Sequence, residues 1–133
     1  MNKHKKLIIT LLRLSLALIF IWFGLLKVFG FNPVHSLIAS VTPMLAEGNG
    51  LILLGAFETL IGIGLLVDKL RKITHILLVL HLSGTFLTFI TGTTVVFQPY
   101  FPVLTLEGEF VLKNLTLALA GLAVLVYGKE VNN

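Results

Sequence analysis

The chain has 133 residues, of which 56% are hydrophobic and 12% are charged. Because a soluble domain carries about 25% charged residues, this composition indicates an integral membrane protein. The apolar segments leave too few residues for a sizeable soluble domain. Its net charge of +4 comes from basic residues that flank apolar runs, which favours the positive-inside rule over nucleic-acid binding. Cysteine is absent, which excludes disulfides, thiol redox chemistry and cysteine-ligated metal centres within the chain.

The first predicted span covers residues 7–29 and follows a short basic segment. Its apolar run is too long for a signal peptide and has no nearby small-residue cleavage site, so we expect a retained transmembrane helix. Arg13 and Lys27 lie on one stripe of this helix, together with Ala17, Phe20 and Gly24. Both cations are expected to reach opposite interfaces by snorkelling. Lys27 also shares the face of Gly24, a residue typical of helix contacts, so a position facing other helices is an open alternative.

A loop over residues 30–49 is predicted next, because Gly30 and Pro33 end the first helix. The middle of this loop is amphipathic at helical spacing but too short to cross a membrane. We therefore expect a short interfacial segment that lies flat on the bilayer or folds over the mouth of the bundle.

The second predicted span, residues 50–67, has a single ionisable residue, Glu58, at its centre. A run of about 20 apolar residues matches the roughly 30 Å hydrocarbon core, and a charge near the midplane costs at least ~2.5 kcal/mol to insert. Such a residue faces the protein interior as a rule and marks a functional site. We expect one face to contact other helices and the opposite face to meet lipid; the first face is Gly55, Glu58, Thr59 and Gly62, and the second is Leu53, Phe57, Leu60 and Ile61.

The third predicted span, residues 73–97, follows a charged connector at residues 68–72. It has the most polar stripe of the chain, which consists of Thr74, Leu78, His81, Thr85, Thr88 and Gly92. A loop with two prolines separates it from the fourth predicted span, residues 109–127. The stripe expected to face other helices in this last span is Lys113, Thr116, Leu117, Ala120, Gly121 and Val124. The glycosylation-like sequence at Asn114 lies inside the span and is discarded.

These elements predict an all-α fold, an integral membrane four-helix bundle that forms a single transmembrane domain over residues 1–133. Eight lysines and arginines fall on the side of the termini, and two, Lys27 and Lys113, fall in the opposite half. The positive-inside rule therefore places both termini in the cytoplasm. We expect the protein in the bacterial cytoplasmic (inner) membrane, with the lipid bilayer as its first partner.

Depth along the helices predicts which ionisable residues meet. With a rise of 1.5 Å per residue, Glu58 and His81 each lie roughly 13 Å from the end of their span, at similar heights on antiparallel neighbours. We predict that they form a pair at the floor of an outward-opening cavity with Lys27 and Lys113 at its rim. The candidate ligand-binding or proton-relay residues are Lys27, Glu58, His81 and Lys113, with Arg13 and Thr85 as secondary candidates. No catalytic residue or metal ligand is predicted, and the alternative is a buried acid that only locks helix packing.

Several short motifs carry a resemblance to a known family. They are the basic start with Arg13, the sequence Gly24-Leu-Leu-Lys27, the stretch Glu58-Thr-Leu-Ile-Gly-Ile-Gly-Leu-Leu before a basic connector, and Glu107-Gly-Glu-Phe-Val-Leu-Lys113-Asn. They resemble the DoxX/DoxD-like family of small membrane proteins. The resemblance implies a four-helix bundle in which Arg13, Lys27, Glu58 and Lys113 match recurring polar positions. Some members are linked to quinone-coupled oxidation of sulfur compounds or to membrane oxidoreductase complexes, and many have no known activity. Likeness to the first group implies a quinone as cofactor and a membrane or peripheral oxidoreductase as partner.

Two hypotheses of function come from different classes. In the first, the protein is a membrane subunit of a redox system that binds a quinone-like or other small ligand. Glu58 and His81 would relay protons, and Lys27 or Lys113 would stabilise the negative charge that develops on the ligand. In the second, it is a small proton-coupled transporter or permease that works as a homo-oligomer. A structural scaffold that holds a membrane or peripheral partner is a further alternative.

Overall fold

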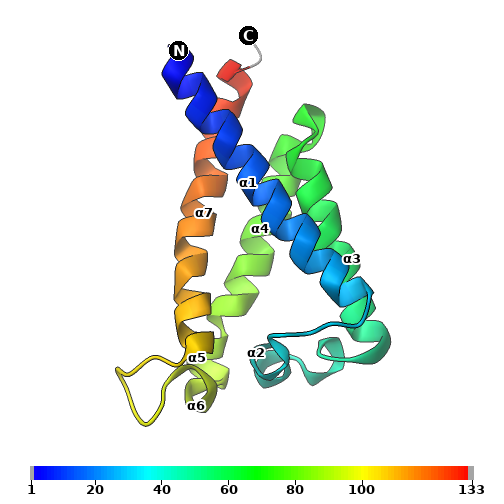
Figure 1. The fold of residues 1–133 in the computed structure, drawn as a ribbon, viewed down its shortest axis with the longest axis vertical. Coiled ribbons are helices and arrows are strands. Elements are labelled where there is room, and N and C mark those ends of the chain that lie inside the picture. The colour runs from blue at the N-terminus through cyan, green and yellow to red at the C-terminus, as the bar shows by residue number, and fades with distance from the viewer. Residues whose placement is uncertain (1, 132–133) are drawn as a thin grey trace.

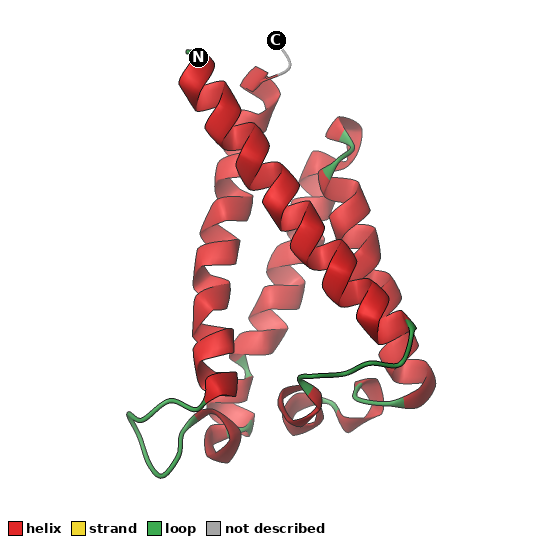
Figure 2. Ribbon diagram, viewed as in Figure 1, coloured by secondary structure: helices red, strands yellow, loops and turns green. Residues whose placement is uncertain are grey.

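The structure is a computed structural model, and it describes residues 2–131. Apart from one isolated bridge between Phe97 and Leu104, the regular structure in this part of the chain is helical (Figure 2). Four stretches of it are long and apolar enough to cross a membrane. They contain α1 (Lys3–Val28), α3 (Gly48–Leu65), α4 (Arg71–Phe86) and α7 (Leu106–Val131). The predicted all-α class and the four candidate spans are thus confirmed.

The four long helices form a ring of neighbours, in which α1 packs against α3 and α7, and α4 packs against α7 and α3. The chain begins and ends at the same end of this bundle, where the short helix η2 (Asp68–Leu70) also connects α3 to α4 (Figure 1). We call this the termini end. The opposite end, which we call the α2 end, holds α2 (His35–Val41) and η1 (Pro43–Leu45).

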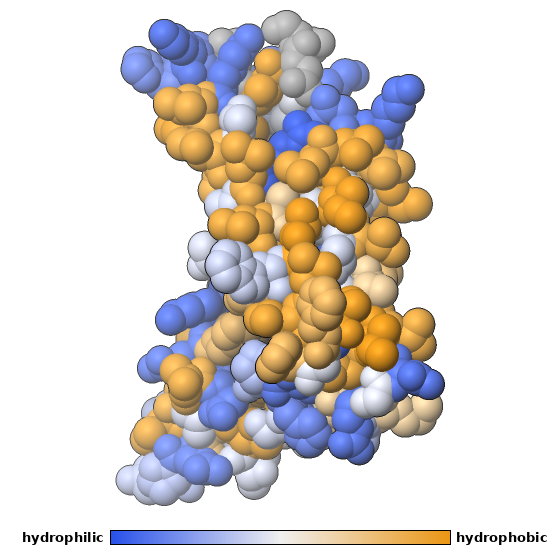
Figure 3. Space-filling view, turned by 45° about the vertical axis from the view of Figure 1, so that its right-hand side comes forward, coloured by the Kyte–Doolittle hydropathy of each residue, from blue (hydrophilic) through white to orange (hydrophobic). Residues whose placement is uncertain are grey.

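The molecular surface has the distribution of a multi-pass membrane protein. Hydrophobic side chains cover most of the middle of the visible face, and hydrophilic side chains gather toward both ends (Figure 3). Large apolar side chains such as Leu18, Leu60 and Leu119 are 58%, 65% and 58% exposed. An exposed apolar area of this size is typical of a surface that contacts lipid.

Buried apolar side chains form one cluster toward the termini end and a smaller one at the α2 end. The first cluster brings together Leu16, Ala17, Phe20, Ile61, Leu65, Leu78, Leu82 and Val124. Its α1–α3 contact depends on Gly62, because a Cβ atom at this position would lie 2.8 Å from the backbone nitrogen of Ile21. Glycine therefore lets the two backbones approach closely, as is typical of membrane helices.

The predicted lipid-facing side of α3 is only partly correct. Leu53 and Leu60 are exposed, but Ile61 is buried in the first cluster and Phe57 is half-buried against His81. The reason is that α3 contacts α1 on one side and α4 on another, so its buried face is wider than a single stripe.

The third span is also less regular than predicted. The expected continuous helix over residues 73–97 ends at Phe86 and continues as the short helices α5 (Thr88–Thr91) and α6 (Thr93–Val96). Three threonine hydroxyls donate to carbonyls three or four residues earlier, with distances of 2.6 Å for Thr85, 2.7 Å for Thr88 and 3.0 Å for Thr91. Such side-chain bonds compete with the helical backbone pattern and bend helices. Gly92 then separates α5 from α6.

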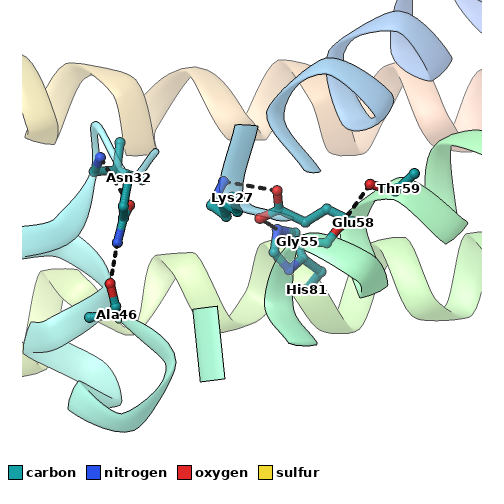
Figure 4. Close-up of polar contacts among 8 residues, drawn as sticks. Lys27, Asn32, Ala46, Gly55, Glu58, Thr59 and His81 are labelled. Carbon is teal, nitrogen blue, oxygen red and sulfur yellow. Dashed lines mark hydrogen bonds and ion pairs between the residues drawn. The ribbon is translucent and has the colours of Figure 1, made fainter. Parts of the chain in front are cut away.

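The amphipathic segment after the first helix folds over the bundle, which was one of the two expected outcomes. Leu37 of α2 is buried against Val96 and Val111 in the second cluster. The amide nitrogen of Asn32 donates to the carbonyl of Ala46 at 2.7 Å, which ties the two ends of this segment together (Figure 4). The segment therefore covers the α2 end of the bundle as a packed element.

Candidate functional site

Three ionisable side chains from three helices meet inside the bundle. The Nζ atom of Lys27, from α1, lies 2.9 Å from Oε2 of Glu58, from α3. The other carboxylate oxygen of Glu58, Oε1, lies 3.2 Å from Nε2 of His81, from α4 (Figure 4). Lys27 and Glu58 are each only 5% exposed. We call these residues the Lys27–Glu58–His81 cluster.

A glycine on α3 allows this cluster to form. A Cβ atom on Gly55 would lie 2.8 Å from Cβ of Lys27 and 2.7 Å from the backbone nitrogen of Val28. Because position 55 has no side chain, α1 approaches α3 closely and brings Lys27 beside Glu58, which is three residues further along α3. The glycine-rich stripe and the buried carboxylate therefore belong to the same contact.

Aromatic rings pack against the cluster. The imidazole of His81 lies between the rings of Phe20 and Phe57, with centroid distances of 5.9 Å to each. The Nζ atom of Lys27 lies 6.0 Å from the ring centroid of Phe23, within the range of a cation–π contact. Apolar rings keep water away from ionic groups and thereby strengthen their mutual attraction, so each group depends strongly on its partner.

A second polar contact joins α4 to α7. The amide nitrogen of Asn114 donates to the hydroxyl oxygen of Thr85 at 3.0 Å, and Asn114 is 5% exposed. Sequence reasoning set Asn114 aside as a discarded glycosylation-like motif. A sequence signal for its orientation does exist, because Asn114, Gly121 and Gly128 follow one another at seven-residue intervals and are all buried.

Both polar contacts border one cavity of about 470 Å³, which is lined mainly by the four long helices and α2. Most of its wall is apolar, and its polar lining residues are Lys27, Thr42, Glu58, His81, Thr85, Thr88 and Asn114. A mostly apolar cavity with a few convergent polar groups is the usual form of a small-molecule site. The arrangement can hold an apolar molecule while charged and hydrogen-bonding groups orient its polar part.

Four of the six candidate residues from the sequence line this cavity: Lys27, Glu58, His81 and Thr85. The predicted contact between Glu58 and His81 is confirmed. The open question about Lys27 is resolved, because its ammonium group turns to Glu58 in the interior instead of snorkelling to an interface.

The remaining two candidates, Lys113 and Arg13, are not among the residues that line the cavity. Lys113 is exposed, because α7 is rotated so that the adjacent Asn114 faces inward. Arg13 lies at the termini end, where its Nη2 atom is 2.8 Å from Oδ1 of Asp68 and its Nε atom donates to the carbonyl of Leu65. Arg13 thus joins α1 to the end of α3, outside the cavity.

Comparison of the chain with known protein families, with curated proteins and with solved structures finds no match. The family resemblance of the short motifs is therefore not supported by these comparisons, and the cavity itself is the main guide to function.

Proposed function

We propose that this membrane protein binds a small, mostly apolar molecule of the quinone class in its intramembrane cavity and serves as the ligand-binding membrane subunit of a redox system. The observation that carries the proposal is the Lys27–Glu58–His81 cluster in the wall of an otherwise largely apolar cavity of about 470 Å³. Apolar side chains would hold four helices together equally well, so a buried ionic cluster beside a cavity favours a role in binding.

The donors in the cavity wall suit an oxygen-bearing ring. An ammonium group has three N–H donors, and the contact of Lys27 with Glu58 uses one of them. A side-chain amide has two N–H donors, and the contact of Asn114 with Thr85 uses one of them. Quinone carbonyl oxygens accept hydrogen bonds, so the wall has donors of the required kind on α1 and on α7.

A quinone supplies two-electron, two-proton chemistry when it is bound. In this chain, the carboxylate of Glu58 and the imidazole of His81 lie at a separation of 3.2 Å, which suits passage of a proton between them. The ammonium of Lys27 places positive charge beside the cavity, where it stabilises negative charge that develops on a ligand oxygen.

The carrier alternative receives less support. A carrier exposes its site alternately to both sides of a membrane, and here the first apolar cluster fills the bundle toward the termini end. A scaffold needs neither a cavity nor a buried acid. The relationship to DoxX-like proteins rests on the short motifs around Lys27, Glu58 and Lys113, and we propose it on that basis together with an oxidoreductase partner and an inner-membrane location.

Binding of a quinone analogue tests the proposal directly. The protein is purified into lipid nanodiscs, extracted for bound quinone, and titrated with a short-tailed ubiquinone analogue by equilibrium dialysis. Loss of a hydrogen bond from a charged donor corresponds to about 1.5–3 kcal/mol, so Lys27→Gln is expected to weaken binding by about 10- to 100-fold. Lys113→Gln, which removes an exposed lysine of the same type, is the matched control and should bind as the wild type does.

A steric variant keeps the test valid if Lys27→Gln unfolds. Gly84 lines the cavity, and a Cβ atom at this position would meet nothing within 4 Å. Gly84→Phe should therefore place a ring in the cavity and abolish binding, whereas Ser83→Phe, at an exposed neighbouring position, should not affect it. Absence of both co-extracted quinone and saturable binding in the wild type would refute the proposal.

A further inference from the structure

The route by which a ligand reaches the cavity follows from what closes each side. The first apolar cluster fills the bundle toward the termini end. At the α2 end, Leu37 is buried against Val96 and Val111, and the bond from Asn32 to Ala46 holds the segment that contains α2. Both ends of the bundle are therefore covered by packed side chains.

Close contacts cross the other three helix–helix boundaries. Between α1 and α3, Gly24 and Gly55 bring the backbones together. Between α1 and α7, the rings of Phe23 and Phe110 lie 6.2 Å apart. Between α4 and α7, Asn114 donates to Thr85, and Leu78 packs close to Gly121.

The boundary between α3 and α4 is different. Leu53 of α3 and Leu80 of α4 both line the cavity, although they are 67% and 62% exposed on the outer surface of the bundle. Gly84, one turn beyond Leu80, lines the cavity without a side chain. The two helices are joined by η2 at the termini end and diverge toward the α2 end (Figure 1). The cavity therefore reaches the molecular surface here, between exposed apolar side chains.

We propose that Leu53, Leu80 and Gly84 form a lateral portal through which the ligand enters from the lipid phase, and that the site takes a molecule with a hydrocarbon tail. This inference rests on the proposed function and specifies its ligand. The polar head lies against the Lys27–Glu58–His81 cluster inside the cavity. The tail extends through the portal into the bilayer, where apolar chain and apolar side chains meet without loss of hydration.

Two ligands that share a head group but differ in the tail test the portal. The probes are a decyl-tailed ubiquinone analogue and the same ring without its tail, each titrated into the protein in nanodiscs. Leu80→Trp and Leu53→Trp narrow the portal, and each should weaken binding of the tailed probe by about tenfold or more while the tail-less probe changes less than about twofold. The matched controls are Ile76→Trp on α4 and Leu60→Trp on α3, which are 58% and 65% exposed and do not line the cavity.

The outcomes separate the portal from the site. Unchanged binding of the tailed probe in both portal variants, or equal weakening of both probes, overturns the portal. If the wild type binds the tail-less probe but not the tailed probe, the portal is also overturned, whereas the proposed function stands. If the wild type binds neither probe, the proposed function itself fails. Thermal unfolding of every variant in nanodiscs verifies that lost binding does not reflect lost structure.

Discussion

Toward the termini, apolar side chains fill the space between the helices, whereas toward α2 the same four helices enclose a cavity with an ionic cluster in its wall. Each half also has an ion pair that involves α1. The side chains of Arg13 and Asp68 are 16% and 46% exposed, whereas the side chains of Lys27 and Glu58 are each 6% exposed. The two halves therefore place similar chemistry in very different surroundings.

This difference in burial indicates which of the two ion pairs contributes to ligand binding. An ion pair at the end of a bundle retains contact with polar surroundings and loses little hydration. A buried pair loses the hydration of both charges, and apolar residues of the same size would often stabilise the fold as well or better. The structure retains the ionic cluster where the cavity lies, so we interpret it as a binding device and the Arg13–Asp68 pair as a helix-end contact.

The largest expected effect comes from removing one charge of the buried pair. Glu58→Leu leaves the ammonium of Lys27 buried without its partner, which should lower the free energy of unfolding by about 3–5 kcal/mol. The double variant Glu58→Leu/Lys27→Leu should recover most of this loss. Unfolding by SDS titration in mixed micelles, followed by circular dichroism, measures both. If Glu58→Leu lowers the free energy of unfolding by less than about 1 kcal/mol, the Lys27–Glu58 pair would be no stronger than an exposed pair such as Arg13–Asp68. The proposed difference between the two pairs would then be refuted.

A pair of glycine substitutions compares the packing of the two halves. Gly62→Ala places a methyl group within 2.8 Å of the backbone of Ile21, so overpacking should cost about 1–3 kcal/mol of unfolding free energy. Gly84→Ala places the same group into the cavity and should be neutral or stabilising by up to about 1 kcal/mol, because alanine favours helix. The same SDS unfolding assay compares them, and equal costs would show that the second half is as tightly packed as the first.

The smallest effect is expected at the helix-end pair. Asp68→Asn should lower the unfolding free energy by less than about 1 kcal/mol, since the carboxylate is nearly half exposed. The effect should shrink further when salt is added, because ions screen exposed charges. Thermal unfolding at low and high ionic strength measures it. A loss as large as that of Glu58→Leu, unaffected by salt, would contradict the assignment of this pair to the helix end.

Helical periodicity predicted the polar stripes of α3 and α4, although the buried face of α3 is wider than its stripe. The expected stripes through Glu58 and through His81 both face the interior, because each combines small or polar residues at three- and four-residue steps with large apolar residues elsewhere. The same reasoning chose the wrong side of α7 near its start. Lys113 and Asn114 are adjacent, and a turn of about 100° around the helix separates them. The seven-residue spacing of Asn114, Gly121 and Gly128 was the stronger signal.

The amino-acid sequence by itself determined the all-α class, the four candidate spans and the central position of Glu58, because these depend on the length and period of apolar runs. Only the tertiary structure decided that Lys27 turns inward and that the boundary between α3 and α4 stays open. These features depend on how far apart the helices lie and how each is rotated against its neighbours. Such relations arise from contacts such as that of Gly55 with α1, which join residues far apart in the chain, and the period of one segment does not show which helix packs against it.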